Sequence, residues 1–159
     1  MIIMGIDPGS AVTGFGLIQR SENGWSLLHH GCVRASRSEG LAGKLGRIYA
    51  DLMAIIEEYG PDLVVVERGF SGRNPRTAMV MGQVLGISLL VANNAGRLVL
   101  EYSPREVKLA VTGFGSASKE QVQYMVKQLL QATEVDLSPD ASDALAVALC
   151  HANKLDVPA

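Results

Sequence analysis

The segment IIMGIDPGSAVTGFGLIQ, residues 2–19, decides the fold, because it contains a strand, a turn and a second strand in immediate succession. Residues 2–6 are apolar apart from one glycine, a pattern typical of a buried strand. Pro8-Gly9 then breaks the chain into a turn, directly after Asp7. The sequence therefore predicts that Asp7 stands at the end of a buried strand.

Two further strands follow this turn. Residues 13–19 alternate glycines with large apolar side chains, and residues 25–33 form another β-like run. The turn signal Asn23-Gly24 separates the two runs and is typical of a hairpin. Together with the first strand, they predict an antiparallel meander of three strands.

The rest of the chain alternates helical with β-like patterns. Residues 41–59 have apolar side chains at helical spacing and end at Gly60-Pro61. Residues 63–66 are apolar on both faces, which predicts a central strand ending at Glu67. We expect a helix over residues 77–95, a strand over residues 97–102, and helices that begin after Ser103, Ser118 and Ser138.

This order of elements predicts an α/β fold with a mixed five-stranded sheet, whose first three strands are antiparallel and whose faces carry helices. The 159 residues, 48% apolar and 19% charged, suit one domain over residues 1–159. The apolar runs are shorter than the ~20 residues of a membrane helix. The N-terminus also lacks a signal-sequence pattern. We therefore expect a cytoplasmic protein without membrane contact.

Four acidic residues occupy unusual positions. Asp7 and Glu67 each follow an apolar strand directly, where ligands gather in α/β sheets. Asp140 and Asp143 are one turn apart at the start of a helix that continues almost wholly apolar. An apolar helix lies against the sheet, so we expect all four carboxylates to converge.

Carboxylates packed together repel one another, and a divalent cation relieves that repulsion. An all-oxygen, acid-rich ligand set suits Mg²⁺, with Mn²⁺ as a substitute, and two such ions about 4 Å apart can hold a reacting phosphodiester. The predicted reaction is hydrolysis by metal-activated water, leaving 5′-phosphate and 3′-hydroxyl ends.

Each acid also has a purely structural interpretation. Asp7 could cap the Pro8-Gly9 turn, and Glu67 could pair with the neighbouring Arg68. Asp140 and Asp143 could complement the dipole of their helix.

The net charge of −2 is unusual for a DNA-binding protein, but its distribution is uneven. Between residues 68 and 100 there are four arginines and no acidic residue. This segment, with Arg73 and Arg76, could face phosphate; scattered surface arginines are the alternative.

These motifs together resemble the RuvC family of Holliday junction resolvases, from Met1 to about Ala152. The resemblance rests on Gly5-Ile6-Asp7-Pro8-Gly9-Ser10 with Thr13-Gly14-Phe15-Gly16, on Val66-Glu67, on Gly115-Ser116-Ala117-Ser118-Lys119, and on Asp140-Ala141-Ser142-Asp143-Ala144-Leu145-Ala146. Two positions depart from the family pattern: Arg68-Gly69 replaces an uncharged polar and a branched residue, and Ser142 replaces a usual Ala.

The resemblance implies an RNase H-like fold and a homodimer that cuts four-way DNA junctions in recombination and repair, with RuvA and RuvB as partners. It implies that Asp7, Glu67, Asp140 and Asp143 bind the metal ions. It also implies that Phe70 contacts bases, that Lys108 and Lys119 contact DNA near the cut, and that Lys119 stabilises charge on the reacting phosphate. From the sequence alone, Phe70 could equally be a core residue.

A stripe of small residues, Ala78, Gly82 and Gly86, recurs every four residues on one predicted helix. The resemblance implies dimerisation through this region, and a two-fold dimer would match the symmetry of a junction. Internal packing against the sheet is the alternative.

Two other functions remain open. An ATP-binding protein of the actin and sugar-kinase type also begins with a strand, an Asp and a Gly-rich hairpin, but such proteins use two lobes. A module that binds branched DNA without cutting is the second alternative.

Overall fold

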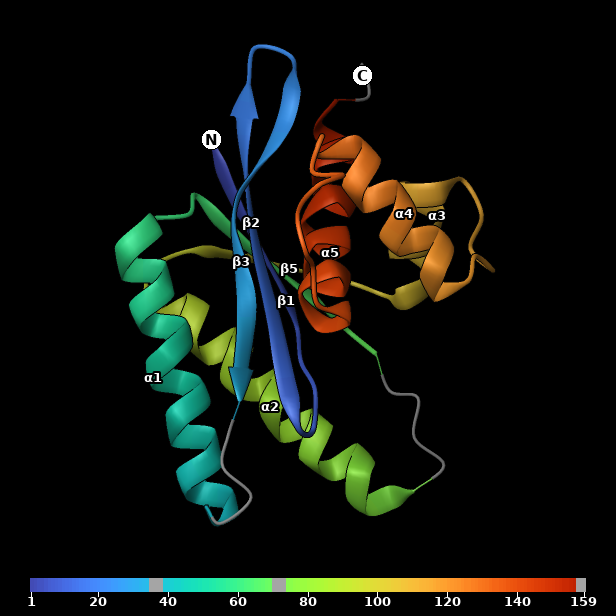
Figure 1. The fold of residues 1–159 in the computed structure, drawn as a ribbon. Helices are drawn as coiled ribbons and strands as arrows, with labels where there is room; N and C mark the ends of the chain where they lie inside the picture. The colour runs from blue at the N-terminus through green and yellow to red at the C-terminus, as the bar shows by residue number, and fades with distance from the viewer. Residues whose placement is uncertain (35–38, 70–73, 157–159) are drawn as a thin grey trace.

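The computed structural model describes residues 1–34, 39–69 and 74–156, and its centre is a five-stranded mixed sheet (Figure 1). The sheet has the order β3-β2-β1-β4-β5. β1 pairs antiparallel with β2, and β2 with β3, whereas β1–β4 and β4–β5 are parallel. The predicted meander is thus confirmed. The strands are β1 (Ile2–Asp7), β2 (Val12–Ser21), β3 (Gly24–Arg34), β4 (Leu63–Glu67) and β5 (Leu98–Tyr102).

Helices cover both faces of the sheet, as the sequence predicts. In Figure 1, α1 and α2 lie on one side and α3, α4 and α5 on the other. Their bounds are α1 (Leu41–Tyr59), α2 (Pro75–Asn94), α3 (Pro104–Thr112), α4 (Lys119–Leu129) and α5 (Pro139–Leu155).

Alternation along the central strands divides the core between the two faces. On β4, Val65 belongs to the cluster shared with α3, α4 and α5, whereas Val64 and Val66 face the cluster shared with α1 and α2. On β1, Ile3 and Met4 divide in the same way. Because successive side chains of a strand point to opposite faces, an apolar run is buried on both sides.

The helix boundaries follow the predicted capping signals. Ser103 with Glu106, and Ser118 with Gln121, both form capping boxes, and Ser138 accepts a hydrogen bond from the backbone N–H of Ala141. α2 begins at Pro75 rather than at the predicted residue 77, because Asn74 caps it and proline suits the first helical position.

Two glycines let α5 approach the sheet closely. A Cβ atom at Gly5 of β1 would overlap the carbonyl oxygen of Ala144, and one at Gly14 of β2 would overlap the carbonyl oxygen of Asp140. Gly14 is also the cross-strand partner of Asp7. The start of α5 is therefore held beside the end of β1.

α2 is the one helix in the described part of the chain that is long and apolar enough to cross a membrane by length and composition. Its mean hydropathy is 1.3, and 22% of the window is buried inside the molecule. One such helix is weak evidence for a membrane span, and its buried Val84 and Val91 belong to the core that it shares with α1 and the sheet.

Candidate active site

The sheet register brings Asp7 and Glu67 to the same edge. β1 and β4 are parallel neighbours, with Ile6 opposite Val66. The next residue of each strand is acidic, so both carboxylates leave the sheet at its carboxyl edge. The expected convergence of these two acids is confirmed.

α5 completes an acidic pocket at this edge. The pocket has a volume of about 350 Å³, and its wall includes the acids Asp7, Glu67 and Asp143 and the cations Lys108 and Lys119. We call it the acidic pocket below. Its charged residues come from β1, β4, α3, α4 and α5, so chain segments more than a hundred residues apart meet here.

Asp140 stands apart from the other three acids. It lies in the first turn of α5, is half-buried and does not belong to the pocket wall. Its charge still helps to raise the pKa of Asp7. Its position also suits the dipole of α5, so the structural interpretation of Asp140 retains support.

Burial and mutual repulsion perturb the carboxyl groups of the pocket. Burial, followed by the charges of Glu67 and Asp143, raises the pKa of Asp7 to about 8. Burial and the charge of Asp143 raise the pKa of Glu67 to about 7, against the opposing effect of Lys119 and Lys108. Such shifts mark a site where negative charge is costly without a cation.

Among the described residues, Lys119 is the cation that pairs with an acid of the pocket. Its Nζ donates a hydrogen bond of 3.0 Å to Oδ2 of Asp143, and this bond together with the charge of Asp143 raises the pKa of Lys119. The side chain of Asp143 is 19% exposed. Lys119 is the first residue of α4 and directly follows the capping residue Ser118. The cap therefore fixes the position of the Lys119 backbone at the start of the helix.

The structural interpretations of Asp7 and Glu67 find no support. In the residues that the structure describes, neither carboxylate accepts a hydrogen bond or forms an ion pair. Asp7 therefore does not cap the Pro8-Gly9 turn, and Arg68 does not pair with Glu67. Among the described residues, both half-buried carboxylates therefore lack a cation at hydrogen-bonding distance.

The chemistry of the donor set suits a hard divalent cation, since every candidate ligand is a carboxylate oxygen. The side chains are not yet arranged around an ion: across residues 1–34, 39–69 and 74–156, no group of three or more His, Cys, Asp or Glu could hold a metal ion as it stands. One oxygen of Asp143 instead accepts a hydrogen bond from Nζ of Lys119.

The apolar part of the pocket wall was missing from the sequence-based expectations. Met81, Val107, Val122 and Ala146 come from four different helices. Their spacing along the chain resembles that of ordinary core residues, so no local pattern distinguishes them. They lower the polarity around the acids, which contributes to the raised pKa values.

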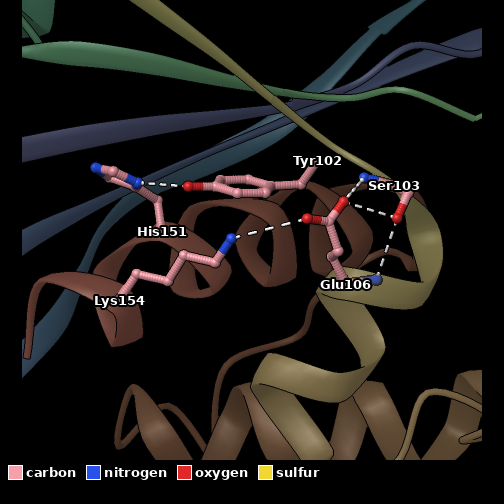
Figure 2. Close-up of polar contacts among 5 residues, drawn as sticks. All are labelled: Tyr102, Ser103, Glu106, His151 and Lys154. Atoms are coloured by element: carbon pink, nitrogen blue, oxygen red, sulfur yellow. Dashed lines mark hydrogen bonds and ion pairs between the residues drawn. The ribbon is translucent and has the colours of Figure 1, made fainter. Parts of the chain in front are cut away.

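A polar network of five residues joins β5, α3 and α5 (Figure 2). Tyr102, the cross-strand partner of Glu67, hydrogen-bonds through its hydroxyl to Nδ1 of His151 at 2.9 Å. Nζ of Lys154 is 3.9 Å from the Tyr102 ring centroid and 3.8 Å from Oε1 of Glu106, the residue that completes the Ser103 cap. The network ties β5 and the start of α3 to the end of α5.

The remaining predicted DNA contacts lie elsewhere or are not placed. Phe70 and Arg73 fall outside the described residues. Arg76 is exposed in the first turn of α2, where it lines a separate hollow together with Ser10 and Lys44. Lys108 is the predicted contact that does reach the acidic pocket.

Comparison with known proteins identifies the family. A family model described as crossover junction endodeoxyribonuclease RuvC matches residues 3–151. Crossover junction endodeoxyribonuclease RuvC of Heliobacterium modesticaldum is 48% identical over 98% of this chain and 96% of its own length. The protein of the same name from Pelotomaculum thermopropionicum is 45% identical over 96% and 93%.

A solved structure agrees. T. thermophilus RuvC in complex with a Holliday junction substrate superposes with a TM-score of 0.90 at 36% identity, covering 98% of this chain and 94% of that one. The yeast mitochondrial resolvase Ydc2, at 13% identity and a TM-score of 0.70, shares the fold. The fold, the family model and the curated relatives agree, and the chain belongs to the RuvC family of crossover junction endodeoxyribonucleases.

Proposed function

We propose that this chain is a metal-dependent endonuclease that cuts four-way DNA junctions as a homodimer. One observation carries the proposal: carboxylates from β1, β4 and α5 line one pocket together with two lysines, and two of these carboxyl groups have raised pKa values. T. thermophilus RuvC, which shares the fold at 36% identity, has been solved with a Holliday junction substrate, and this supports the choice of DNA.

We assign metal binding to Asp7, Glu67, Asp140 and Asp143, with Mg²⁺ as the ion, two per site, and Mn²⁺ as a substitute. Bound divalent ions would supply an acidified attacking water and stabilise the departing 3′ oxygen, so that 5′-phosphate and 3′-hydroxyl ends result. Asp143 must release Lys119 before both of its oxygens can serve as ligands.

The lysines would act on the phosphate. A substrate phosphate in the acidic pocket meets Lys119 and Lys108 on its wall. Lys119 can exchange Asp143 for a non-bridging phosphate oxygen and so stabilise the charge that develops there. Pairing with Asp143 before the substrate binds keeps the lysine oriented toward the reacting position.

A two-fold dimer would make two coordinated cuts. The small-residue stripe on α2 supports it, because a Cβ at Gly86 would meet nothing within 4 Å and Gly86 is exposed. Internal packing therefore does not explain that glycine. Contacts of Phe70, Arg73 and Arg76 with DNA, and RuvA and RuvB as partners, belong to the same proposal.

The decisive experiment is a nicking assay on a four-way junction labelled on each strand, with a linear duplex of the same sequence as the control. We expect the wild type to make paired nicks in the junction with Mg²⁺ and none with EDTA. Asp7→Asn and Asp143→Asn should still bind the junction without cutting it. Cutting by either variant would contradict the assignment, and binding without cutting by the wild type would favour a non-cleaving module.

Lys119 is tested by Lys119→Met, with Lys127→Met two turns later on α4 as the matched control. We expect Lys119→Met to lower the single-turnover cleavage rate about 100-fold, in line with the loss of one charge-stabilising donor. Lys127→Met should stay within about twofold of the wild type, because that lysine is not in the pocket wall. Equal losses would mean that general charge, rather than Lys119, matters.

A further inference from the structure

Phe114 is an exposed aromatic residue that none of the preceding assignments uses. It lies in the segment that joins α3 to α4, and 71% of its surface is exposed to solvent. A single exposed apolar side chain is common on protein surfaces, so the significance of Phe114 depends on its surroundings.

The backbone around Phe114 is held in place by hydrogen bonds. The hydroxyl of Thr112 accepts a bond from the Phe114 N–H at 3.1 Å and donates one to the carbonyl of Lys108 at 2.8 Å. The Phe114 carbonyl accepts from the N–H of Ala117 at 3.1 Å. Gly113, with φ of 81°, ends α3 in the left-handed conformation that glycine favours. The ring is therefore presented from a defined turn.

The helices that flank this turn carry cations, two of which line the acidic pocket. The two helices that it joins carry Lys108 and Lys119, which both line the pocket wall. Arg105 lies against the turn, because a Cβ at Gly115 would be only 2.9 Å from its Cγ and 3.3 Å from its Nε. Within the described residues, Arg105 is exposed and forms no hydrogen bond or ion pair.

We propose that Phe114 stacks on a nucleotide of the DNA strand that enters the acidic pocket, while Arg105 binds a neighbouring backbone phosphate. The inference rests on the proposed nuclease function and extends its substrate contacts. An aromatic ring beside cationic side chains is the combination that binds nucleic acid strands through their bases and phosphates. A protein-docking patch would instead be depleted of charge at its centre.

The test is fluorescence anisotropy of a labelled four-way junction in EDTA, titrated with each variant at several salt concentrations. Phe114→Ala should weaken binding at least about fivefold, the lower end of the effect of removing a stacked aromatic. The slope of log affinity against log salt should be unchanged, because no phosphate contact is lost. Phe114→Tyr should restore binding, and Phe114→Leu, which is apolar but not aromatic, should not.

Arg105→Gln should give a different signature. We expect weaker binding with a salt slope reduced by about one, as for the loss of one phosphate contact. The matched controls are Tyr124→Ala, which removes an aromatic ring from α4 that is 63% exposed, and Leu109→Ala, which removes an apolar side chain from α3 that is 55% exposed. Both should stay within twofold of the wild type.

Three results would overturn the inference. Phe114→Ala and Phe114→Leu could both bind within twofold of the wild type, or Tyr124→Ala could weaken binding as much as Phe114→Ala. Phe114→Ala and Leu109→Ala could also alter the oligomeric state without altering DNA affinity, which would mark a protein surface. A wild type that shows no preference for the junction over duplex would instead contradict the proposed function itself.

Discussion

At the scale of single residues, the raised pKa of the Asp7 carboxyl group makes the stability of the protein depend on pH. Its pKa is 3.8 in an unperturbed chain and about 8 in the folded protein. Between these pH values the folded protein holds a proton that the unfolded chain has released. The free energy of unfolding therefore falls as the pH rises through this window.

We predict that Asp7→Asn removes the part of this dependence that Asp7 causes, because an amide carries no charge at any pH, whereas Glu67 keeps its own part. In EDTA, the stability of the variant relative to the wild type should be at least about 1 kcal/mol higher at pH 8 than at pH 5. Urea unfolding at both pH values measures the difference. Mg²⁺ at pH 8 should stabilise the wild type and not the variant.

The control for this prediction is Glu57→Gln, on the exposed surface of α1. It should leave the difference between pH 5 and pH 8 unchanged. A wild type that is equally stable at the two pH values in EDTA would show that Asp7 is not held in its protonated form.

Ser142 gives a second prediction at this scale. It is 1% exposed, and its hydroxyl has no hydrogen-bond partner among the described residues. A buried polar group without a partner is destabilising, so Ser142→Ala should raise the free energy of unfolding by about 1 kcal/mol. The comparison is Ser88→Ala, since the Ser88 hydroxyl donates to the Val84 carbonyl at 2.9 Å; that change should bring no gain.

At the scale of elements, α5 depends on glycine in the strands beneath it. A Cβ at Gly5 would overlap the Ala144 carbonyl oxygen and lie 2.9 Å from the Ala148 nitrogen, and backbone cannot move aside as a side chain can. We predict that Gly5→Ala lowers the free energy of unfolding by at least about 3 kcal/mol, measured by urea unfolding.

Gly46→Ala is the control for Gly5→Ala, because Gly46 has room for a Cβ atom. It is exposed in the middle of α1, and a Cβ there would meet nothing within 4 Å. Gly46→Ala should therefore stabilise the protein by about 0.5–1 kcal/mol, through helix propensity alone. If both changes had similar effects, close approach of α5 would not be the reason for Gly5.

At the scale of the whole molecule, α2 presents an outward face that packs against no other element among the described residues. Met79 is 66% exposed and Leu90 47% exposed, with Gly86 between them. We predict that Gly86→Arg converts the proposed dimer to a monomer and abolishes paired incision of a junction, because the side chain would block close approach of two helices.

Light scattering coupled to size-exclusion chromatography measures that outcome. Gly46→Arg, which adds the same side chain to an exposed helical glycine on α1, is the matched control and should leave the mass unchanged. A dimeric Gly86→Arg variant would place the interface elsewhere.

Much of this protein could be predicted locally. The capping serines and the apolar strands could be predicted from the sequence, because each depends on contacts among a few neighbouring residues. Asp7 and Glu67 could be found because an acid directly after a buried strand is costly without a function. Phe70 and Arg73, outside the described residues, stay predictions, as does the assignment of Asp140 to the metal site.

Tertiary structure alone decided the rest. The Lys119–Asp143 bond joins residues 24 apart, and the apolar pocket wall joins four helices. Such contacts depend on strand order and on how closely α5 sits over Gly5 and Gly14, which no local periodicity encodes. The exposure of Phe114 likewise depends on the tertiary structure, because the residue type alone does not determine which other residues pack against a side chain.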